Sequence, residues 1–332
     1  MNLTQRPRRL RASQAMRNLV SENSVQKESL ILPLFVREGI KEPVAIKNMP
    51  GVVQHTFASL HQEVDRALKL GIGGIMVFAI PEERDELGSQ ALNPENILNR
   101  SIRAIRDQVG DELIVIADLC LDEFTSHGHC GVLTADGTVD NDQTLEIYAK
   151  MAVLLAKNGA HMLGTSGMMD GQVGAVRQGL DTANFKDVSI LAYAAKYASA
   201  FYGPFRDAVE SQLQGDRKTY QQNPSNLKES MREIKLDVQE GADIIMIKPG
   251  MMYLDVIYAA SQEIDLPLAS YIVSGEMAMV EAAAAVGAVE RERAILEILT
   301  SLRRAGAQII CTYWALEVAE LLTRNQDHDP KH

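Results

Sequence analysis

The feature that most constrains the fold of this chain is a regular alternation between short apolar runs and longer amphipathic stretches. Apolar runs without an alternating polar face are typical of strands covered on both sides, as in a parallel sheet flanked by helices. A glycine stands just before several of the runs, where it would end the preceding helix. The runs are residues 30–36, 73–80, 113–119, 160–164, 188–194, 242–247, 266–273 and 307–313.

Eight strand–helix units of this kind predict a protein of the α/β class, a closed (β/α)8 TIM barrel. The alternative is an open, doubly wound sheet. No Gly-x-Gly-x-x-Gly and no P-loop sequence follows any of the runs, which argues against a nucleotide-binding form of that fold. We therefore expect a single barrel domain over residues 29–328, followed by a short tail at 329–332.

The start of the chain differs from the rest in charge. No acidic residue occurs from Met1 to Ser21, and mitochondrial transit peptides share this composition. We favour an extended N-terminal arm over residues 1–28 that packs on the acidic surface of another subunit, because the chain as a whole carries a net charge of -11. The arginines of this stretch are Arg6, Arg8, Arg9, Arg11 and Arg17.

The composition also limits the partners. A net charge of -11 argues against nucleic acid, since phosphate binding needs a basic surface. The chain has 3 cysteines, no apolar run near the roughly 18 residues of a membrane span, and no signal-peptide pattern. We expect a cytoplasmic protein that acts on small molecules, with neither a nucleic acid nor a membrane as partner.

Two lysines close apolar runs that should be buried: Lys196 and Lys248. Burial or a second cation lowers the pKa of a lysine, and the neutral amine attacks carbonyl carbons. Each lysine alone could equally be a snorkelling or salt-bridged side chain. Two of them at strand ends of one barrel favour Schiff-base chemistry.

Further polar residues stand at the ends of the predicted strands. Active sites of TIM barrels lie at the carboxyl ends of the strands, so these residues are candidates for binding substrate. They are Asp118, Ser166, Lys196, Lys248, Ser274 and Tyr313.

The segment from Asp118 to Gly131 predicts a metal site. Residues two apart on a strand face the same way, so Cys120 and Asp122 can share one face, and a loop with glycines can return Cys130 to them. Two thiolates and a carboxylate suit zinc better than magnesium, and three ligands leave a position open for catalysis. The alternative is that Cys120 fills the core and the acids cap a turn.

A long polar and aromatic stretch, residues 196–207 followed by 215–221, indicates a lid. Its cations Arg206, Arg217 and Lys218 are suited to binding a substrate carboxylate, although each alone could be an ordinary surface residue. Glu233 lies off the apolar stripe of a predicted helix, and the residues alone indicate only a solvated glutamate.

These motifs together resemble the porphobilinogen synthase family, also called delta-aminolevulinic acid dehydratase, over nearly the whole chain. The resemblance implies a TIM barrel whose N-terminal arm embraces a neighbouring subunit, usually in an octamer. The motifs are Arg6-Pro-Arg-Arg-Leu-Arg11, Met49-Pro-Gly51, the 118–131 segment, Met169-Asp-Gly171, Phe201-Tyr-Gly-Pro-Phe-Arg206, Gly215-Asp-Arg-Lys218, Lys248-Pro-Gly250 and Val273-Ser-Gly-Glu276.

The resemblance implies a hydro-lyase of tetrapyrrole biosynthesis that joins two 5-aminolevulinate molecules into porphobilinogen with loss of two waters. Lys248 would form a Schiff base with the substrate that becomes the propionate side, and Lys196 with the substrate that becomes the acetate side. Further roles are implied by position: Arg206 and Arg217 for the carboxylate of one substrate, with Lys218 and Gln221 nearby, Ser274 and Tyr313 for the other, and Glu233 for an allosteric magnesium ion.

The chain departs from the family patterns at three places. Its metal segment combines Cys120 and Cys130 of the zinc pattern with Asp122 of the oxygen pattern, and zinc is favoured. Thr165 replaces a frequent proline, and Ala195 replaces a frequent hydroxyl residue. Two alternatives stay open: a Schiff-base aldolase, which would need one lysine and no metal, and a metal-responsive assembly without turnover.

Overall fold

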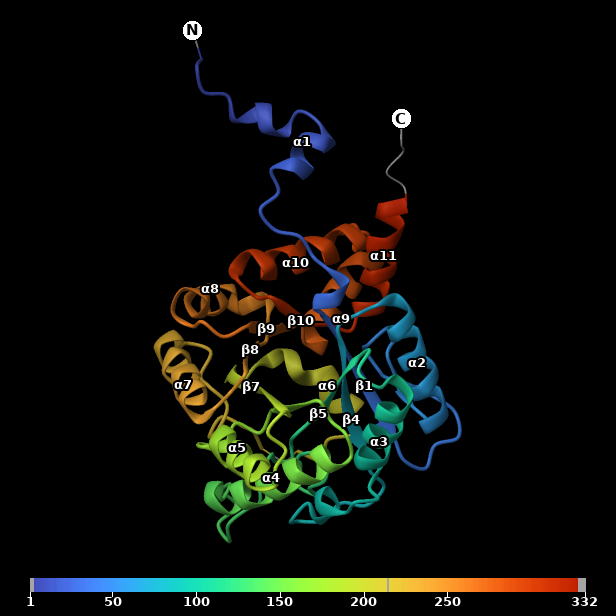
Figure 1. The fold of residues 1–332 in the computed structure, drawn as a ribbon, viewed down its shortest axis with the longest axis vertical. Helices are drawn as coiled ribbons and strands as arrows, with labels where there is room; N and C mark the ends of the chain where they lie inside the picture. Colours follow the sequence, from blue (N-terminus) through green and yellow to red (C-terminus); the bar gives the residue numbers. More distant parts are fainter. Residues whose placement is uncertain (1–2, 214, 328–332) are drawn as a thin grey trace.

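Eight parallel strands close into a barrel in the computed structural model, which describes residues 3–213 and 215–327 (Figure 1). Each strand pairs with the next along the chain, and the last pairs with the first through Leu30–Ile310 and Ile31–Cys311. The barrel strands are β1 (Leu30–Arg37), β4 (Gly74–Ile80), β5 (Ile114–Asp118), β6 (Met162–Thr165), β7 (Ser189–Lys196), β8 (Ile244–Lys248), β9 (Leu268–Tyr271) and β10 (Ile309–Cys311).

Each of the eight predicted runs overlaps one barrel strand, so the predicted fold class is confirmed. Two short strands were not predicted: β2 (Val44–Ala45) and β3 (Val53–His55) form an antiparallel pair, and β3 also pairs with the end of β1. They were missed because two or three residues, of which those of β2 are exposed, give no apolar run.

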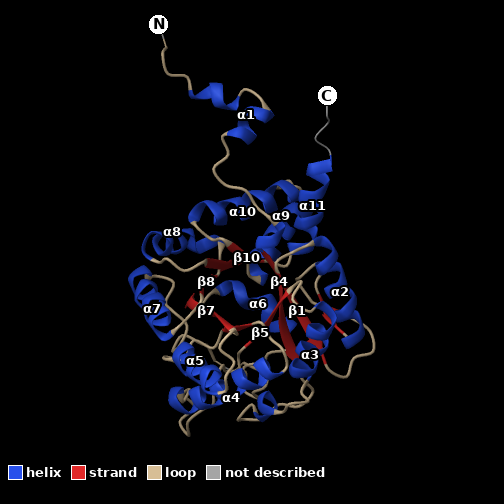
Figure 2. Ribbon diagram, viewed as in Figure 1, coloured by secondary structure: helices blue, strands red, loops and turns tan. Residues whose placement is uncertain are grey.

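Helices surround the strands on the outside, as Figure 2 shows. Local signals set their ends: Thr56 accepts a hydrogen bond from the Ser59 amide at the start of α2, and left-handed Gly71 ends it. The outer helices are α2 (Phe57–Leu70), α3 (Ile97–Val109), α4 (Asn141–Lys157), α5 (Gln172–Thr182), α7 (Leu227–Glu240), α8 (Leu254–Glu263), α9 (Ser274–Ala285), α10 (Arg291–Ala305) and α11 (Ala315–Asp327).

Two apolar layers hold the barrel together, one between strands and helices and one inside the barrel. Successive side chains of a strand point to opposite faces, so they contribute in turn to the outer and the inner layer. In β8, Ile245 and Ile247 pack on the helices, whereas Met246 points into the barrel. Lys248, two residues after Met246, therefore points inward at the carboxyl end of the strand.

In strand β7, a β-bulge turns the terminal lysine, Lys196, into the barrel. Leu191 and Tyr193 face the interior, so strict alternation would turn Lys196 toward the helices. The pairing with β8 shifts between Ala192 and Ala195, which is the signature of a β-bulge. Ala195 then packs in the outer layer, and Lys196 turns into the barrel directly beside Lys248.

The N-terminal arm runs away from the barrel (Figure 1). Its two helical turns, η1 (Pro7–Arg11) and α1 (Gln14–Leu19), contain no buried residue. In the described parts of the chain, no helix combines the length and apolar character needed to cross a membrane. The predicted tail at 329–332 lies outside the described residues.

Candidate active site

A cavity at the carboxyl ends of the strands brings together most of the predicted site residues. Its volume is about 20 Å³, which is room for a single water molecule, because lid residues fill the mouth. Substrate entry therefore requires the lid to move. The predicted residues that line it are Asp118, Asp122, Ser166, Lys196, Arg206, Arg217, Gln221 and Lys248.

Lys248 is buried among aromatic rings that the sequence did not indicate. Its Nζ lies 4.2 Å from the ring centre of Tyr271, 5.1 Å from Tyr193 and 5.3 Å from Phe205. Burial, and next the positive charge of Lys196, lower the pKa of Lys248 to about 7. At neutral pH a large fraction of this amine is therefore unprotonated and nucleophilic.

Lys196 lies beside Lys248 across the β7–β8 pairing and is 5% exposed. Its Nζ donates a hydrogen bond to the carbonyl oxygen of Ser166, at 2.5 Å. Ser166 therefore contributes its backbone to the site and fixes the direction of the Lys196 side chain.

Asp118 ends β5 and is buried in the same cavity. Burial, and next the negative charge of Asp122, raise the pKa of Asp118 to about 7, against the attraction of Lys196 and Lys248. Its Oδ1 has no hydrogen-bond partner among the described residues. A carboxyl group with this pKa can take or give a proton near either lysine.

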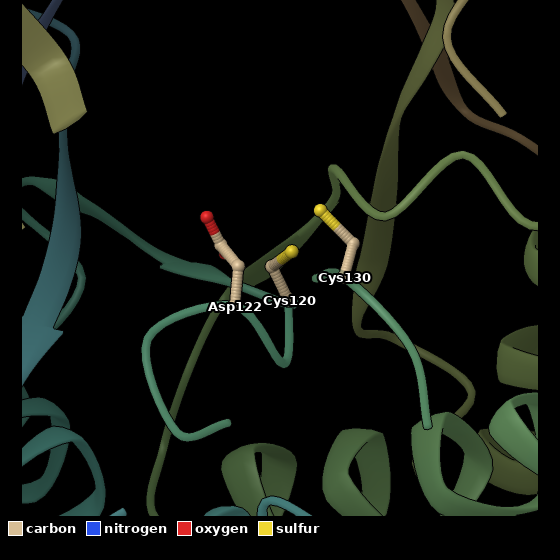
Figure 3. A group of neighbouring side chains, drawn as sticks. All are labelled: Cys120, Asp122 and Cys130. Carbon is tan, nitrogen blue, oxygen red and sulfur yellow. The ribbon is translucent and has the colours of Figure 1, made fainter. Parts of the chain in front are cut away.

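Cys120, Asp122 and Cys130 form a buried group whose ligand atoms all lie within 4.8 Å of one another. In Figure 3 the sulfur of Cys120 points toward Cys130, which enters from the returning part of the loop. The Cys120–Cys130 hydrogen bond is the main cause that lowers the pKa of Cys130, whereas burial raises the pKa of Cys120. The donor set, two sulfurs and a carboxylate, fits zinc.

Arg217 contacts this group directly. Its side chain is 10% exposed, and its guanidinium donates to Asp122 Oδ2 at 2.8 Å and to the carbonyl oxygen of Gly128 at 2.8 Å. Burial opposes ionisation of Asp122, but Arg217 and then Lys196 hold the pKa of Asp122 below its usual value. The lid is thus tied to the metal-ligand group by a buried ion pair.

Three predicted substrate residues lie outside the cavity. Lys218 is exposed and pairs with Asp216 at 2.8 Å. Ser274 is buried at the start of α9, where its Oγ accepts a hydrogen bond from the Phe205 amide at 2.9 Å. Tyr313 contacts Tyr271 through their hydroxyls at 3.2 Å, so it lies one side chain away from Lys248.

Glu233 lines a separate hollow beside the active cavity, with a volume of about 140 Å³. It shares this hollow with Asp170, Glu229 and Asp237. Burial, and next the charge of Asp170, raise the pKa of Glu233, and burial raises the pKa of Asp237 to about 8. Carboxyl oxygens suit a hard cation such as magnesium, but these four are not gathered as one ligand set: among the described residues, only Cys120, Asp122 and Cys130 bring three potential ligand atoms close to one another.

Sequence reasoning missed several residues around the metal-ligand group. Buried Glu123 accepts a hydrogen bond from the Ala79 amide at 3.0 Å and so fixes the loop to the end of β4. Tyr148 of α4 and Tyr220 of the lid contact Cys130 through its backbone. No local pattern distinguishes these tyrosines from core residues, because their partners are 18 and 90 positions away.

The two departures at Thr165 and Ala195 leave the cavity lining intact. Thr165 lines the hollow of Glu233, and Ala195 packs in the outer apolar layer. Neither side chain lines the cavity that contains the two lysines.

The fold and this site define a barrel enzyme with two buried lysines beside a buried group of side chains that could hold a metal ion. The chain belongs to the delta-aminolevulinic acid dehydratase family, whose family model matches residues 4–321. The predicted family and the hydro-lyase activity, that of a 5-aminolevulinate dehydratase, are therefore confirmed.

Curated relatives and a solved structure agree with this assignment. The delta-aminolevulinic acid dehydratase of Streptomyces coelicolor is 55% identical over 319 residues, covering 96% of this chain and 97% of that protein. The enzyme of the same name from Escherichia coli is 47% identical over 319 residues, covering 96% and 98%. The delta-aminolevulinic acid dehydratase (porphobilinogen synthase) of Toxoplasma gondii, solved with the reaction product porphobilinogen, superposes with a TM-score of 0.95, at 42% identity, over 99% and 95% of the two chains.

The lowered pKa of Lys248 predicts an unusual pH dependence of its reactivity. Below pH 7 the amine is protonated and unreactive, and above pH 7 it is neutral, so reductive methylation by formaldehyde and cyanoborohydride should reach half its maximal rate near pH 7. Peptide mass spectrometry after short pulses measures this rate. Exposed lysines of the same sample are the reference, since an unperturbed amine gains reactivity up to about pH 10.4. Parallel profiles for Lys248 and the exposed lysines would contradict the assignment.

Proposed function

We propose that the chain condenses two 5-aminolevulinate molecules asymmetrically into porphobilinogen through Schiff bases on Lys196 and Lys248. The observation that carries this proposal is the position of the two lysines, which are neighbours across β7 and β8 and line one buried cavity. An aldolase of the Schiff-base type needs only one such lysine. The confirmed family membership supports the two-lysine reaction.

Lys248 is the nucleophile toward the substrate that becomes the propionate side, and Lys196 toward the substrate that becomes the acetate side. Each amine replaces a ketone oxygen, and the two imines account for the two waters lost. The imine acidifies the adjacent carbon, so that a carbon–carbon bond forms between the two substrates and releases one lysine. The free amine of one substrate then attacks the other imine carbon, which closes the ring and releases the second lysine.

Asp118 is suited to moving protons during these steps. It lies in the cavity of both lysines, and its pKa of about 7 lets it act in either direction at neutral pH. The aromatic rings around Lys248 exclude water from the imine and keep the amine desolvated. The chain itself thus supplies both nucleophiles and a proton carrier.

Substrate carboxylates are bound by the lid and by the far side of the barrel mouth. Arg206, Arg217 and Gln221 line the cavity, and exposed Lys218 follows Arg217 in the lid. On the other side, Ser274 touches the lid at Phe205, and Tyr313 touches Tyr271. We propose that opening of the lid turns these groups toward two substrate molecules.

Two metal sites belong to the proposal. Cys120, Asp122 and Cys130 hold zinc, whose positive charge polarises a substrate oxygen when the ion is bound. Glu233 holds an allosteric magnesium ion in the neighbouring hollow of carboxylates. The choice of zinc for the first site rests on its two sulfur donors, and the choice of magnesium for the second rests on its oxygen donors alone.

The assembly and the location are also proposals. The arm of residues 1–28 contacts other subunits in a homo-octamer, which is supported by its two helical turns without a buried residue. The protein acts in the cytoplasm, where a reducing milieu keeps cysteines free. All three cysteines are free in the structure, and two of them belong to the zinc site.

Replacing the nucleophile tests the reaction. Lys248→Met should lower porphobilinogen formation from 5-aminolevulinate at least about a thousandfold, or about 4 kcal/mol of transition-state stabilisation, because the imine cannot form. The assay is the appearance of the pyrrole. Lys150→Met, at an exposed position of α4, is the control and should keep activity. Near-normal turnover of Lys248→Met with an intact fold would refute the proposed role.

Metal removal tests the two ion sites. Chelated protein should lose at least about tenfold in product formation, because the zinc ligands then hold no Lewis acid. Zinc should restore the activity, and magnesium should increase it further in wild type but not in Glu233→Gln. Full activity of the zinc-free protein would show that the cysteine pair is incidental to catalysis.

A further inference from the structure

We propose that Tyr148 is a positioning residue of the metal site: its one hydroxyl hydrogen holds the backbone carbonyl of Cys130 and can turn instead to the sulfur of Cys120 when that sulfur is a metal-bound thiolate. This inference rests on the proposed zinc site. Tyr148 does not line the cavity of the two lysines, and its hydroxyl contacts both cysteines of the metal-ligand group.

The contacts of the Tyr148 hydroxyl involve two of the three proposed metal ligands. It donates to the carbonyl oxygen of Cys130, and its Oη lies 3.8 Å from Cys120 Sγ, within hydrogen-bond reach of sulfur. A hydroxyl has one hydrogen but can rotate, so the same group can serve the carbonyl or the sulfur. A sulfur that becomes a metal-bound thiolate carries more charge and is the better acceptor.

Gly167 lies against the tip of the Tyr148 ring. A methyl group at Gly167 would overlap the Tyr148 hydroxyl, so this glycine leaves the space into which the ring tip fits. Tyr148 is fully buried. A rigid, buried phenol can fix the position of the ligands it touches, whereas an exposed one would move with the solvent.

Helix α4 presents a second hydroxyl to the same loop. Thr144 lies four residues before Tyr148, hence on the same face of the helix, and its Oγ1 accepts a hydrogen bond from the Val132 amide at 3.1 Å. Two successive turns of α4 therefore hold the segment that carries Cys130. Only Tyr148 also reaches a sulfur atom.

The lid provides a contrasting contact. The Cys130 amide donates a hydrogen bond to Tyr220 Oη at 3.4 Å. Tyr220 thus holds the amide of Cys130, and Tyr148 holds its carbonyl oxygen. Tyr220 belongs to the segment that must move for substrate entry. Tyr148 belongs to a helix of the barrel wall, so it can keep the cysteines together while the lid opens.

The test compares Tyr148→Phe with wild type in metal binding rather than in activity alone. Hydrogen bonds to metal ligands typically contribute about 10- to 100-fold in metal affinity, so zinc affinity, measured by competition with a chromophoric chelator, should fall by that factor. In the cobalt-substituted protein, the sulfur-to-cobalt charge-transfer band should shift, because a hydrogen bond to the thiolate is lost. Tyr197→Phe is the matched control: it removes a hydroxyl from another buried tyrosine, which contacts Ser230 and Asn226 instead.

Each outcome decides the question. Weaker zinc binding and a shifted band in Tyr148→Phe, with Tyr197→Phe unchanged, would support the inference. Weaker binding with an unchanged band would reduce Tyr148 to a structural residue and overturn it, as would unchanged binding. If wild type shows no sulfur-to-cobalt band at all, the zinc site itself fails, and this inference fails with it, whatever the fate of the two lysines.

Discussion

Desolvation of two amines at neighbouring strand ends is the interaction on which the rest of the site depends. Lys196 and Lys248 are each 5% exposed and lie side by side across β7 and β8. A barrel interior filled by aromatic rings removes water from Lys248, and the neighbouring amine adds repulsion, so its pKa falls to about 7. Asp118 balances part of this charge and is itself shifted to the same range.

A second layer of the site links the chemistry to the lid. Arg217 of the lid forms a buried ion pair with Asp122. This pair connects the lid to the metal-ligand group. On the other side, α4 fixes the cysteine loop through Tyr148. The ligand group thus lies between a movable contact and a fixed one. The proposed opening of the lid would break the first contact and leave the second intact.

The sequence predicted the parts of this structure that depend on local pattern. Apolar runs located all eight barrel strands, and alternation in β8 places Lys248 inward by the same rule. Alternation in β7 would have placed Lys196 outward, and only the β-bulge near Ala195 corrects its direction. The pairing of Arg217 with Asp122 joins residues 95 positions apart, so it could not be predicted from spacing. Lys218, Ser274 and Tyr313 do not line the lysine cavity. Their positions could not be predicted either, because Ser274 and Tyr313 pack against Phe205 and Tyr271, which are far from them in the sequence.

The central claim, that both lysines form imines with substrate, is tested most directly by reduction with borohydride in the presence of 5-aminolevulinate, followed by peptide mass spectrometry. We predict that substrate mass is attached at Lys248 and at Lys196, and that Lys248→Met keeps only the label at Lys196. Labelling of neither lysine, or of only one of them, in protein that forms porphobilinogen would contradict it.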